Sequence, residues 1–168
     1  MDAFGTLVFQ VVGQQLSVGA TRTILDRLAA GFGGRLPAPA QLLAAEPEQL
    51  RHAGLSRRKV QTLRAAAQRF LDGALSIEAL QPLSDEQVEA TLTAIPGIGP
   101  WTAQGFLILA LGREDVVLPG DLALRNAIRR AYGLDHLPSP DEVLKIADPW
   151  RPYRTLATSY LFASAFDD

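Results

Sequence analysis

Apolar residues recur every three or four positions along most of this 168-residue chain, which is the spacing of amphipathic helices. No segment alternates apolar and polar residues convincingly in the way that a half-buried strand does. The pattern therefore predicts an all-α protein. The expected helices lie near residues 4–13, 17–32, 39–45, 47–53, 56–72, 84–94, 100–112, 121–132, 140–147 and 150–166.

Capping residues support the limits of these helices. Ser84 and Gln87 form a capping-box pattern, and Ser139 precedes a proline that suits the first helical position. Glycines stand where several helices should end. The short turn at Gly54 also joins two expected helices, like a degenerate copy of a second turn at Gly97.

Composition narrows the classes of function. A hydrophobic content of 48% over this length is enough for one domain or two small lobes. The absence of cysteine excludes disulfides, thiolate zinc sites and cysteine-held iron–sulfur clusters. The only histidines, His52 and His136, are far apart, which argues against a histidine-rich metal site or a catalytic triad. No apolar run reaches the roughly 20 residues of a membrane span, so we expect a cytoplasmic protein without membrane contact.

Charge is unevenly distributed along the chain. The net charge of −2 argues weakly against nucleic acid as a partner. However, six basic and no acidic residues lie between Arg51 and Leu71, and three arginines and no acid lie between Leu122 and Leu134. One face can therefore be basic although the whole protein is slightly acidic. Solvated helix faces are the alternative explanation.

The segment Leu92–Ala103 reads Leu-Thr-Ala-Ile-Pro-Gly-Ile-Gly-Pro-Trp-Thr-Ala and predicts two helices joined by a tight turn. Gly97 and Gly99 permit backbone angles that other residues resist, and Ile98 is expected to anchor the turn in the core. Backbone amides of such a turn suit a phosphate oxygen, directly or through a bridging monovalent cation at residues 95–99. An ordinary helical connection is the alternative.

Asp121 follows Leu-Pro-Gly at the expected start of a helix. Aspartate is common as an N-cap, and a helix N-terminus favours the ionised carboxylate. Beside DNA, such a carboxylate can stabilise positive charge at C1′ of deoxyribose and orient or deprotonate an attacking water. This is the chemistry of glycosidic bond cleavage, applied to a nucleoside. The capping and catalytic roles are compatible.

The span 92–125 resembles the helix-hairpin-helix (HhH-GPD) DNA glycosylase superfamily. It carries Leu-x-x-Ile-Pro-Gly-Ile-Gly-Pro and an aspartate 24 residues after Gly97, so the resemblance implies that Asp121 is catalytic. Members that also cut the sugar carry a lysine at the position of Trp101. The resemblance therefore implies hydrolysis without AP-lyase activity. The absence of cysteine separates the chain from the iron–sulfur branch, the endonuclease III type.

Further motifs are similar to 3-methyladenine DNA glycosylase II, the AlkA type, and extend over nearly the whole chain. They are Val-Val-Gly-Gln-Gln-Leu-Ser at 11–17, Gly-Leu-Ser-x-x-Lys at 54–59, Pro-Trp-Thr-Ala at 100–103 and Asp-Pro-Trp-Arg-Pro-Tyr-Arg at 148–154. The resemblance implies a single two-lobed helical glycosylase domain over 1–168, with its active site in the cleft between the lobes. One lobe would span about 36–116 with the hairpin 92–103, and the other about 1–35 plus 117–168.

The resemblance also implies individual roles. Base flipping needs a few kcal/mol, and a DNA wedge at Gln15, with Leu16 beside it, would offset this. For Leu16 itself a position in the core is favoured. Trp101 would form a wall of the base pocket, where a cationic purine gains about 0.5–2 kcal/mol from the indole. Leu122, Gly105 and Ser159 would also line the base pocket. The residues that would contact the DNA backbone are Gly97, Ile98, Gly99, Thr102, Lys59 and Arg125. Gly105 and Ser159 stand where the family carries aromatics, which predicts a more open pocket.

The implied substrate is double-stranded DNA that contains alkylated purines of the 3-methyladenine and 7-methylguanine type. The implied enzyme is monofunctional and monomeric, nucleoid-associated if bacterial, and uses no cofactor or catalytic metal. Trp150 and Tyr153 are expected in the core, whereas Arg151 and Arg154 either bind phosphate or brace the last helix. A glycosylase for another lesion and a helix-hairpin-helix protein that binds DNA without catalysis are the alternatives.

Overall fold

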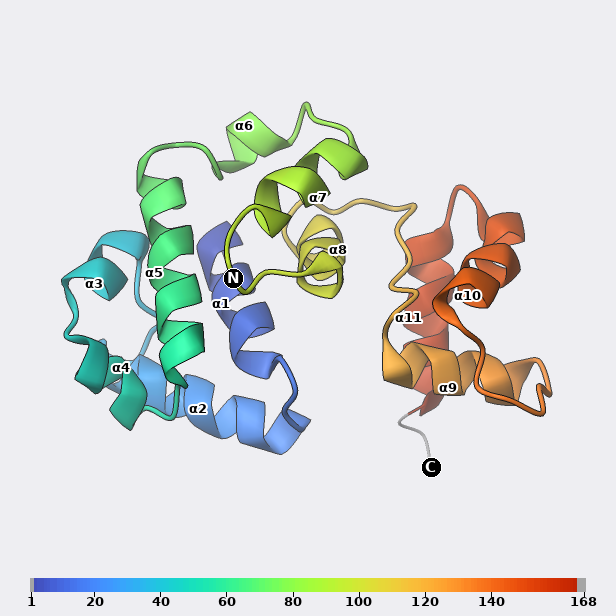
Figure 1. Cartoon of the computed structure of the whole chain (residues 1–168), viewed down its shortest axis with the longest axis horizontal. Coiled ribbons are helices and arrows are strands. Elements are labelled where there is room, and N and C mark those ends of the chain that lie inside the picture. The colour runs from blue at the N-terminus through green and yellow to red at the C-terminus, as the bar shows by residue number, and fades with distance from the viewer. Residues whose placement is uncertain (1, 166–168) are drawn as a thin grey trace. The chain divides into compact units, whose positions relative to one another are not determined.

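The computed structural model describes residues 2–165, and every regular element in that range is a helix (Figure 1). This confirms the all-α prediction for the described part of the chain. Two compact units cover residues 1–106 and 107–168. None of the described helices is long and apolar enough to cross a membrane.

The first unit contains α1 (Ala3–Gly13), α2 (Val18–Ala30), α3 (Pro39–Ala44), α4 (Pro47–His52), α5 (Arg57–Leu71), α6 (Ile77–Leu80), α7 (Asp85–Thr93) and most of α8 (Pro100–Leu109). The second unit contains the end of α8, then α9 (Leu122–Ala131), α10 (Pro140–Ala147), the 3₁₀ helix η1 (Asp148–Trp150) and α11 (Arg154–Ala165).

Helices α1 and α5 form the centre of the first unit. Nearly all of α1 is apolar and buried, including Leu7 and Val11, and it packs against α5. The rings of Phe4 and Phe70 meet edge to face, with centroids 5.2 Å apart. This division differs from the expected lobes, which grouped residues 1–35 with 117–168, because α1 buries its apolar side chains against α5.

Helices α9 and α11 form the centre of the second unit. Leu124 and Ile128 are the fully buried residues of α9, which packs against α11 and α10. The buried segment Val116–Leu118 leads from α8 to the start of α9. The position that precedes α9 is therefore held at the edge of a packed core.

Most expected helices occur with ends that differ by a few residues. The capping box of Ser84 and the cap at Ser139 are confirmed, and Ser139 also forms a capping box with Glu142. Helix α6, a single turn that is capped by Ser76, was not predicted from the sequence. One helix was predicted over 150–166, whose last residue lies outside the described range. The structure instead has η1, a turn and α11, because the proline at 152 disfavours helical angles at the preceding residue, and Arg151 has an extended ψ of 140°.

Candidate functional site

The turn between α7 and α8 depends on glycine at position 97. Gly97 has a φ of +93°, and a Cβ there would lie 3.2 Å from the Cβ of Thr62 and closer still to its hydroxyl. That hydroxyl donates to the carbonyl of Pro96 at 2.8 Å. Ile98 is 5% exposed, which confirms that it anchors the turn. Glycine is therefore required both by the backbone angle and by the hydroxyl packed against it.

The same turn presents backbone amides. The amides of Gly97 and Gly99 donate to no acceptor within residues 2–165. A Cβ at Gly99 would meet nothing within 4 Å, so the space beside it is open. The first turn of α8 follows directly and adds the positive end of its dipole. The arrangement has the chemistry of an anion-binding turn.

A polar network, here called the hairpin brace, holds this turn to the end of α1. Nε2 of Gln14 donates to the carbonyl of Gly97 and to the hydroxyl of Thr102, both at 3.0 Å. Nζ of Lys59 donates to the carbonyls of Val12 at 2.8 Å and Gln14 at 2.9 Å. Burial lowers the pKa of the Lys59 ammonium. Lys59, Gln14 and Thr62 together define the brace.

The brace changes the interpretation of two expected DNA contacts. Lys59 is part of the brace, and the hydroxyl of Thr102 accepts a hydrogen bond from it, so both side chains help to position the two turns. Gln15 follows the braced end of α1 and is exposed, with a φ of +57°. Leu16 is 41% exposed, so a core position for it is wrong. The turn therefore projects two exposed side chains at the positions expected for the wedge.

In the second unit, Asp121 is the N-cap of α9, as predicted. Its Oδ1 accepts a hydrogen bond from the amide of Leu124 at 2.9 Å, which fixes the direction of the carboxylate. The next side chain, Leu122, is 59% exposed. Nε of Arg125 donates to the carbonyl of Pro138 at 2.7 Å, so part of that guanidinium is used within the unit.

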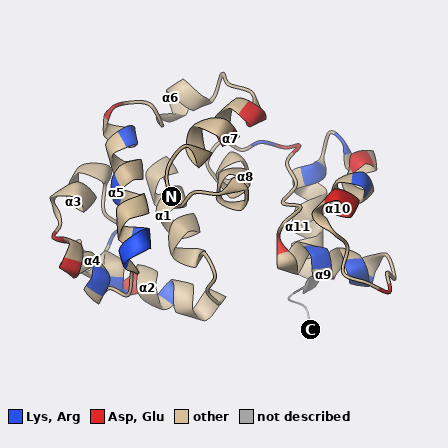
Figure 2. Ribbon diagram, in the orientation of Figure 1, with Lys and Arg blue, Asp and Glu red and all other residues tan. Residues whose placement is uncertain are grey.

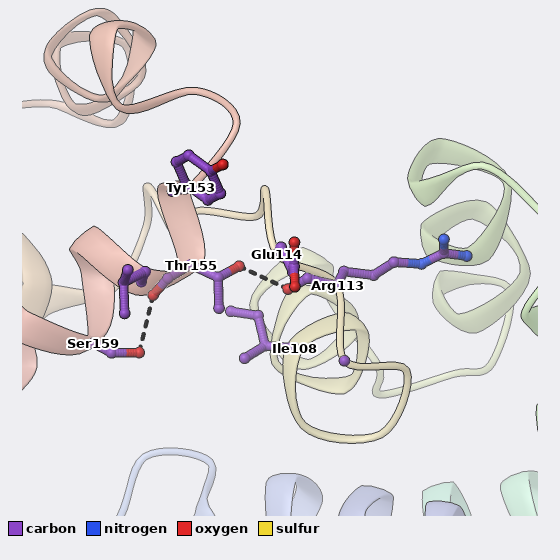
Figure 3. A pocket seen from close by; sticks show the side chains of 8 residues that line it. Ile108, Arg113, Glu114, Tyr153, Thr155 and Ser159 are labelled. Carbon is purple, nitrogen blue, oxygen red and sulfur yellow. Dashed lines mark hydrogen bonds between the residues drawn. The ribbon is translucent and has the colours of Figure 1, made fainter.

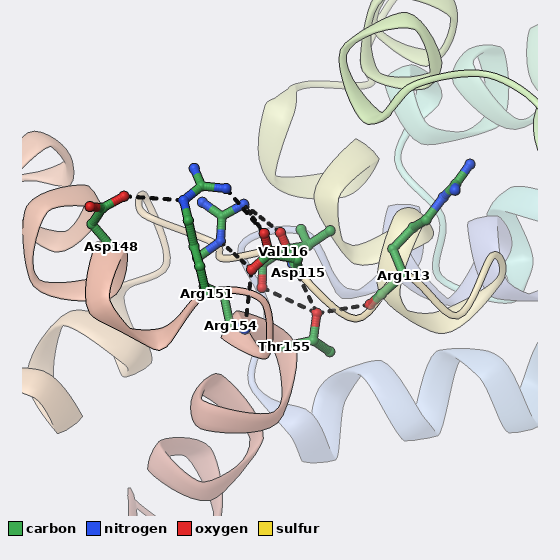
Figure 4. A network of polar contacts seen from close by, with 7 residues as sticks. All are labelled: Arg113, Asp115, Val116, Asp148, Arg151, Arg154 and Thr155. Carbon is green, nitrogen blue, oxygen red and sulfur yellow. Dashed lines mark hydrogen bonds and ion pairs between the residues drawn. The ribbon is translucent and has the colours of Figure 1, made fainter.

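An ionic cluster, here called the Asp115 clamp, holds the segment before Asp121 (Figure 4). The carboxylate of Asp115 accepts from Nε of Arg154 at 2.7 Å and Nη2 at 3.0 Å, and from Nη1 of Arg151 at 3.1 Å. The hydrogen bond from Arg154 is the main reason that the pKa of Asp115 lies below its ordinary value. Arg151 and Arg154 were expected either to bind phosphate or to support the last helix. The structure shows the second role, because both pair with Asp115 at the start of that helix.

A pocket of about 470 Å³ lies within the second unit beside the start of α11 (Figure 3). Tyr153 lines it and is 60% exposed, so the expected core position of Tyr153 is wrong, whereas Trp150 is half-buried. Ser159 also lines this pocket and donates to the carbonyl of Thr155 at 2.9 Å. Gly105, the other expected replacement of an aromatic, belongs to the first unit.

Gly105 is buried against a side chain that the sequence analysis did not select. A Cβ at Gly105 would lie 2.7 Å from Cδ of Gln10 and closer still to its Nε2. Gln10 is 5% exposed and lies on α1. The available signal was a lone amide within an otherwise apolar stretch. Among residues 2–165, no group of three or more His, Asp or Glu side chains could hold a metal ion.

The family model described as "HhH-GPD superfamily base excision DNA repair protein" matches residues 8–152. The chain belongs to this superfamily. The resemblance that the hairpin and Asp121 predicted is thereby confirmed.

This HhH-GPD chain is similar to several proteins with more specific names. It is 32% identical to "Putative DNA-3-methyladenine glycosylase YfjP" of Bacillus subtilis, over 92% of this chain and 56% of that protein. It is also 32% identical to "DNA-3-methyladenine glycosylase 1" of Schizosaccharomyces pombe, over 98% of this chain and 73% of that protein. The structure of 3-methyladenine DNA glycosylase (Mag1) from the same yeast, in complex with abasic DNA, matches with a TM-score of 0.91 and 32% identity. That match covers 98% of this chain and 81% of that one.

The expected site residues of this HhH-GPD protein fall in both units. The first unit carries the residues of the hairpin, including Trp101. It also carries Gln15, Leu16, Lys59 and Gly105. The second carries Asp121, Leu122, Arg125 and Ser159. Trp101 is the second residue of α8 and is half-buried.

Proposed function

We propose that this chain is a DNA glycosylase that hydrolyses the N-glycosidic bond of alkylated purines in double-stranded DNA, the first step of base excision repair. The observation that carries the proposal is the combination of an amide-presenting Pro-Gly-Ile-Gly-Pro hairpin with a carboxylate fixed at a helix N-terminus. Both occur in an HhH-GPD chain whose relatives are named DNA-3-methyladenine glycosylases.

In the proposed function, the hairpin binds the DNA backbone. The open space at Gly99 admits a phosphate oxygen to the amides of the turn. The carbonyls of residues 95–97 each accept one hydrogen bond, and the remaining lone pairs suit a bridging monovalent cation. Arg57 and Arg58 are exposed on α5, and Lys and Arg positions recur along this helix (Figure 2). These contacts position the duplex without reading its sequence, and affinity should fall with salt.

The exposed turn after α1 supplies the wedge. Gln15 would enter the gap that the flipped nucleotide leaves. The hydrogen bonds of the brace would keep the turn in place while Gln15 is inserted. The flipped base would stack on Trp101. A cationic alkylated purine gains an additional attraction from the indole.

Asp121 would carry the chemistry. When the bond between C1′ and the base nitrogen breaks, the electron pair leaves with the base, and positive charge develops at C1′. The Asp121 carboxylate, oriented by the amide of Leu124, stabilises that charge. Water then bonds to C1′ and gives up one proton, which leaves free base and an abasic site. An alkylated purine is already cationic, so its departure does not require a general acid.

We further propose that the enzyme is monofunctional and of the AlkA type. The position that holds the lyase lysine in other members is Trp101 here. Lys59 donates to two carbonyls at the end of α1, which removes its ammonium from the role of a nucleophile. The second lysine, Lys145, is an exposed residue of α10. Water is therefore the attacking group.

Asp121→Asn tests the catalytic assignment. We expect release of 3-methyladenine and 7-methylguanine from a duplex to fall by roughly 100-fold or more, the usual effect of losing a charge-stabilising group. Binding to abasic duplex DNA should remain. Asp141→Asn is the matched control, because Asp141 is an exposed first-turn residue of another helix. Normal release by Asp121→Asn would overturn the assignment and favour a protein that binds DNA without catalysis.

Product analysis tests the remaining points. Strands should stay intact after base release until they are treated with hot alkali, and borohydride should trap no covalent complex. Immediate strand cleavage would contradict a monofunctional enzyme. A panel of alkylated, deaminated and oxidised duplexes identifies the substrate. Release of only deaminated or oxidised bases would favour a glycosylase for another lesion.

A further inference from the structure

Gln10 is the one amide side chain in α1, and its carboxamide oxygen is buried without a hydrogen-bond partner in the described part of the chain. It is 5% exposed, and its Oε1 has no hydrogen-bond partner within residues 2–165. Burial of an unpaired amide disfavours folding. An apolar side chain of similar size would avoid this penalty. The stability of the fold therefore does not explain why position 10 carries an amide.

Gly105 makes the room that this amide occupies. A Cβ at position 105 would lie 2.7 Å from Cδ of Gln10 and 2.9 Å from its Oε1. Glycine in the middle of a helix is itself unfavourable, and Gly105 lies well inside α8. Two unfavourable choices, a buried amide and a helical glycine, thus occur at one contact and depend on each other.

The contact lies one helical turn from the residue that would stack on the base. Trp101 precedes Gly105 by four positions, so both project from the same face of α8. On the opposing helix, Gln14 follows Gln10 by four positions and donates to the hydroxyl of Thr102. The two helices therefore meet at two points, where Gln14 contacts Thr102 and where Gln10 lies against Gly105.

We propose that Gln10 is a specificity-determining residue whose carboxamide hydrogen-bonds the edge of the extruded purine beside Trp101. A carboxamide pairs one acceptor with adjacent donors, which matches a purine edge that carries an exocyclic amino group next to a ring nitrogen. The ligand class is therefore an adenine-type alkylated base. The inference rests on the proposed function and adds to it the group that reads the base.

Gln10→Met tests this inference, since methionine is unbranched and of similar length. Release is compared on one duplex with 3-methyladenine and one with 3-methylpurine, which lacks the 6-amino group. We expect the wild-type protein to prefer the amino base by about tenfold, within the range for a paired hydrogen-bonding edge. Gln10→Met should bring the two rates close together. Its melting temperature should stay unchanged or rise, because an unpaired buried amide is removed.

Gly105→Ala provides an independent route to the same result. The new Cβ must displace the carboxamide, so the preference for the amino base should again collapse. Gln10→Ala combined with Gly105→Ala removes the clash and should recover stability without recovering the preference. Gly19→Ala is the matched control, because a Cβ at this helical position meets nothing within 4 Å.

The deciding quantity is the ratio between the two bases. A ratio in Gln10→Met within twofold of the wild-type ratio overturns the inference, including the case in which both rates fall together with stability. The binding affinities of Asp121→Asn, with and without Gln10→Met, for the same two duplexes give the ratio without catalysis. If the wild-type protein releases neither base, the proposed function fails, and this binding ratio still decides whether Gln10 reads the base.

Discussion

The hairpin brace and the Asp115 clamp both fix a loop in place, but they do so with different polar groups. Each holds a loop that carries a proposed site residue: the brace fixes the Gly97 turn, and the clamp fixes the segment before Asp121. The brace uses an amide, a hydroxyl and one ammonium, and most of their bonds go to backbone carbonyls. The clamp uses a carboxylate between two guanidinium groups.

Because of this difference, we expect the two loops to respond differently to pH. Backbone carbonyls do not titrate, so in acid the brace keeps its acceptors and its charged ammonium. Asp115 has a pKa below its ordinary value of 3.8, chiefly through the hydrogen bond from Arg154. Its contribution to stability is therefore fully present above that ordinary value and is lost as the pH falls through the lowered pKa. Acid should loosen the segment before Asp121 while the hairpin stays held.

Gly97→Ala should have the largest effect on this comparison, because it removes the fit between the hairpin and its brace. A positive φ costs an alanine about 1–2 kcal/mol, and overpacking against Thr62 adds about 1–3 kcal/mol. We expect the free energy of unfolding, measured in urea, to fall by about 2–4 kcal/mol.

Gly99→Ala is its matched control, because its Cβ meets open space and its φ is not positive. We expect stability to change little in Gly99→Ala while affinity for duplex DNA falls. Equal loss of stability in both variants would show that the brace does not determine the turn.

Asp115→Asn should have the next largest effect. Hydrogen bonds to charged groups contribute about 1.5–3 kcal/mol each, and the Asp115 side chain is 29% exposed, so we expect a loss of about 2 kcal/mol at neutral pH. The difference in the free energy of unfolding between variant and wild type should narrow as the pH falls below about 4. Protonation of Asp115 then removes the same ion pairs from the wild-type protein.

Asp148→Asn is the comparison variant for the clamp, since Asp148 is 73% exposed and pairs with Nε of Arg151. Its effect should be near zero, as is typical of surface pairs. A gap in Asp115→Asn that is independent of pH would argue that packing, and not charge, holds the loop.

Glu142→Gln should have the smallest effect and extends the comparison to alkaline pH. Hydrogen bonds to Asp135 and Glu142 raise the pKa of His136, and the pKa of Glu142 is lowered to about 2, mainly by the Ser139 amide. Because the pKa of His136 is raised, its contribution is present below about 6.5 and is lost as the pH rises through the raised value.

The melting temperature of Glu142→Gln should therefore fall more at pH 6 than at pH 9, by about 1–2 °C. An NMR titration should show the pKa of His136 moving down in the variant. An unchanged pKa would mean that Glu142 does not pair with His136 in solution.

Local signals in the sequence were sufficient for much of the fold. The caps at Ser84 and Ser139, the buried Ile98 and the N-cap role of Asp121 depend on residues a few positions apart, and all were confirmed. One helix was predicted across residues 150–166, although the residue before a proline rarely has helical angles, a local rule that applies to Arg151.

Contacts between distant residues could not be predicted. Lys59 bonds carbonyls 45 and 47 positions away, and Asp115 pairs with Arg154 across 39 positions. Hydrophobic periodicity contains no information about such partners. The pairing of Gln10 with Gly105 is a further example, because each residue alone looks only like a weak local choice.

The left-handed backbone at Gln15 has a consequence for directed evolution. Glycine would adopt a φ of +57° with about 1 kcal/mol less strain than glutamine. A laboratory population selected only for heat resistance should therefore accumulate glycine at position 15. The same population grown under an alkylating agent should retain a long side chain there, so the two selective regimes would drive this one codon in opposite directions.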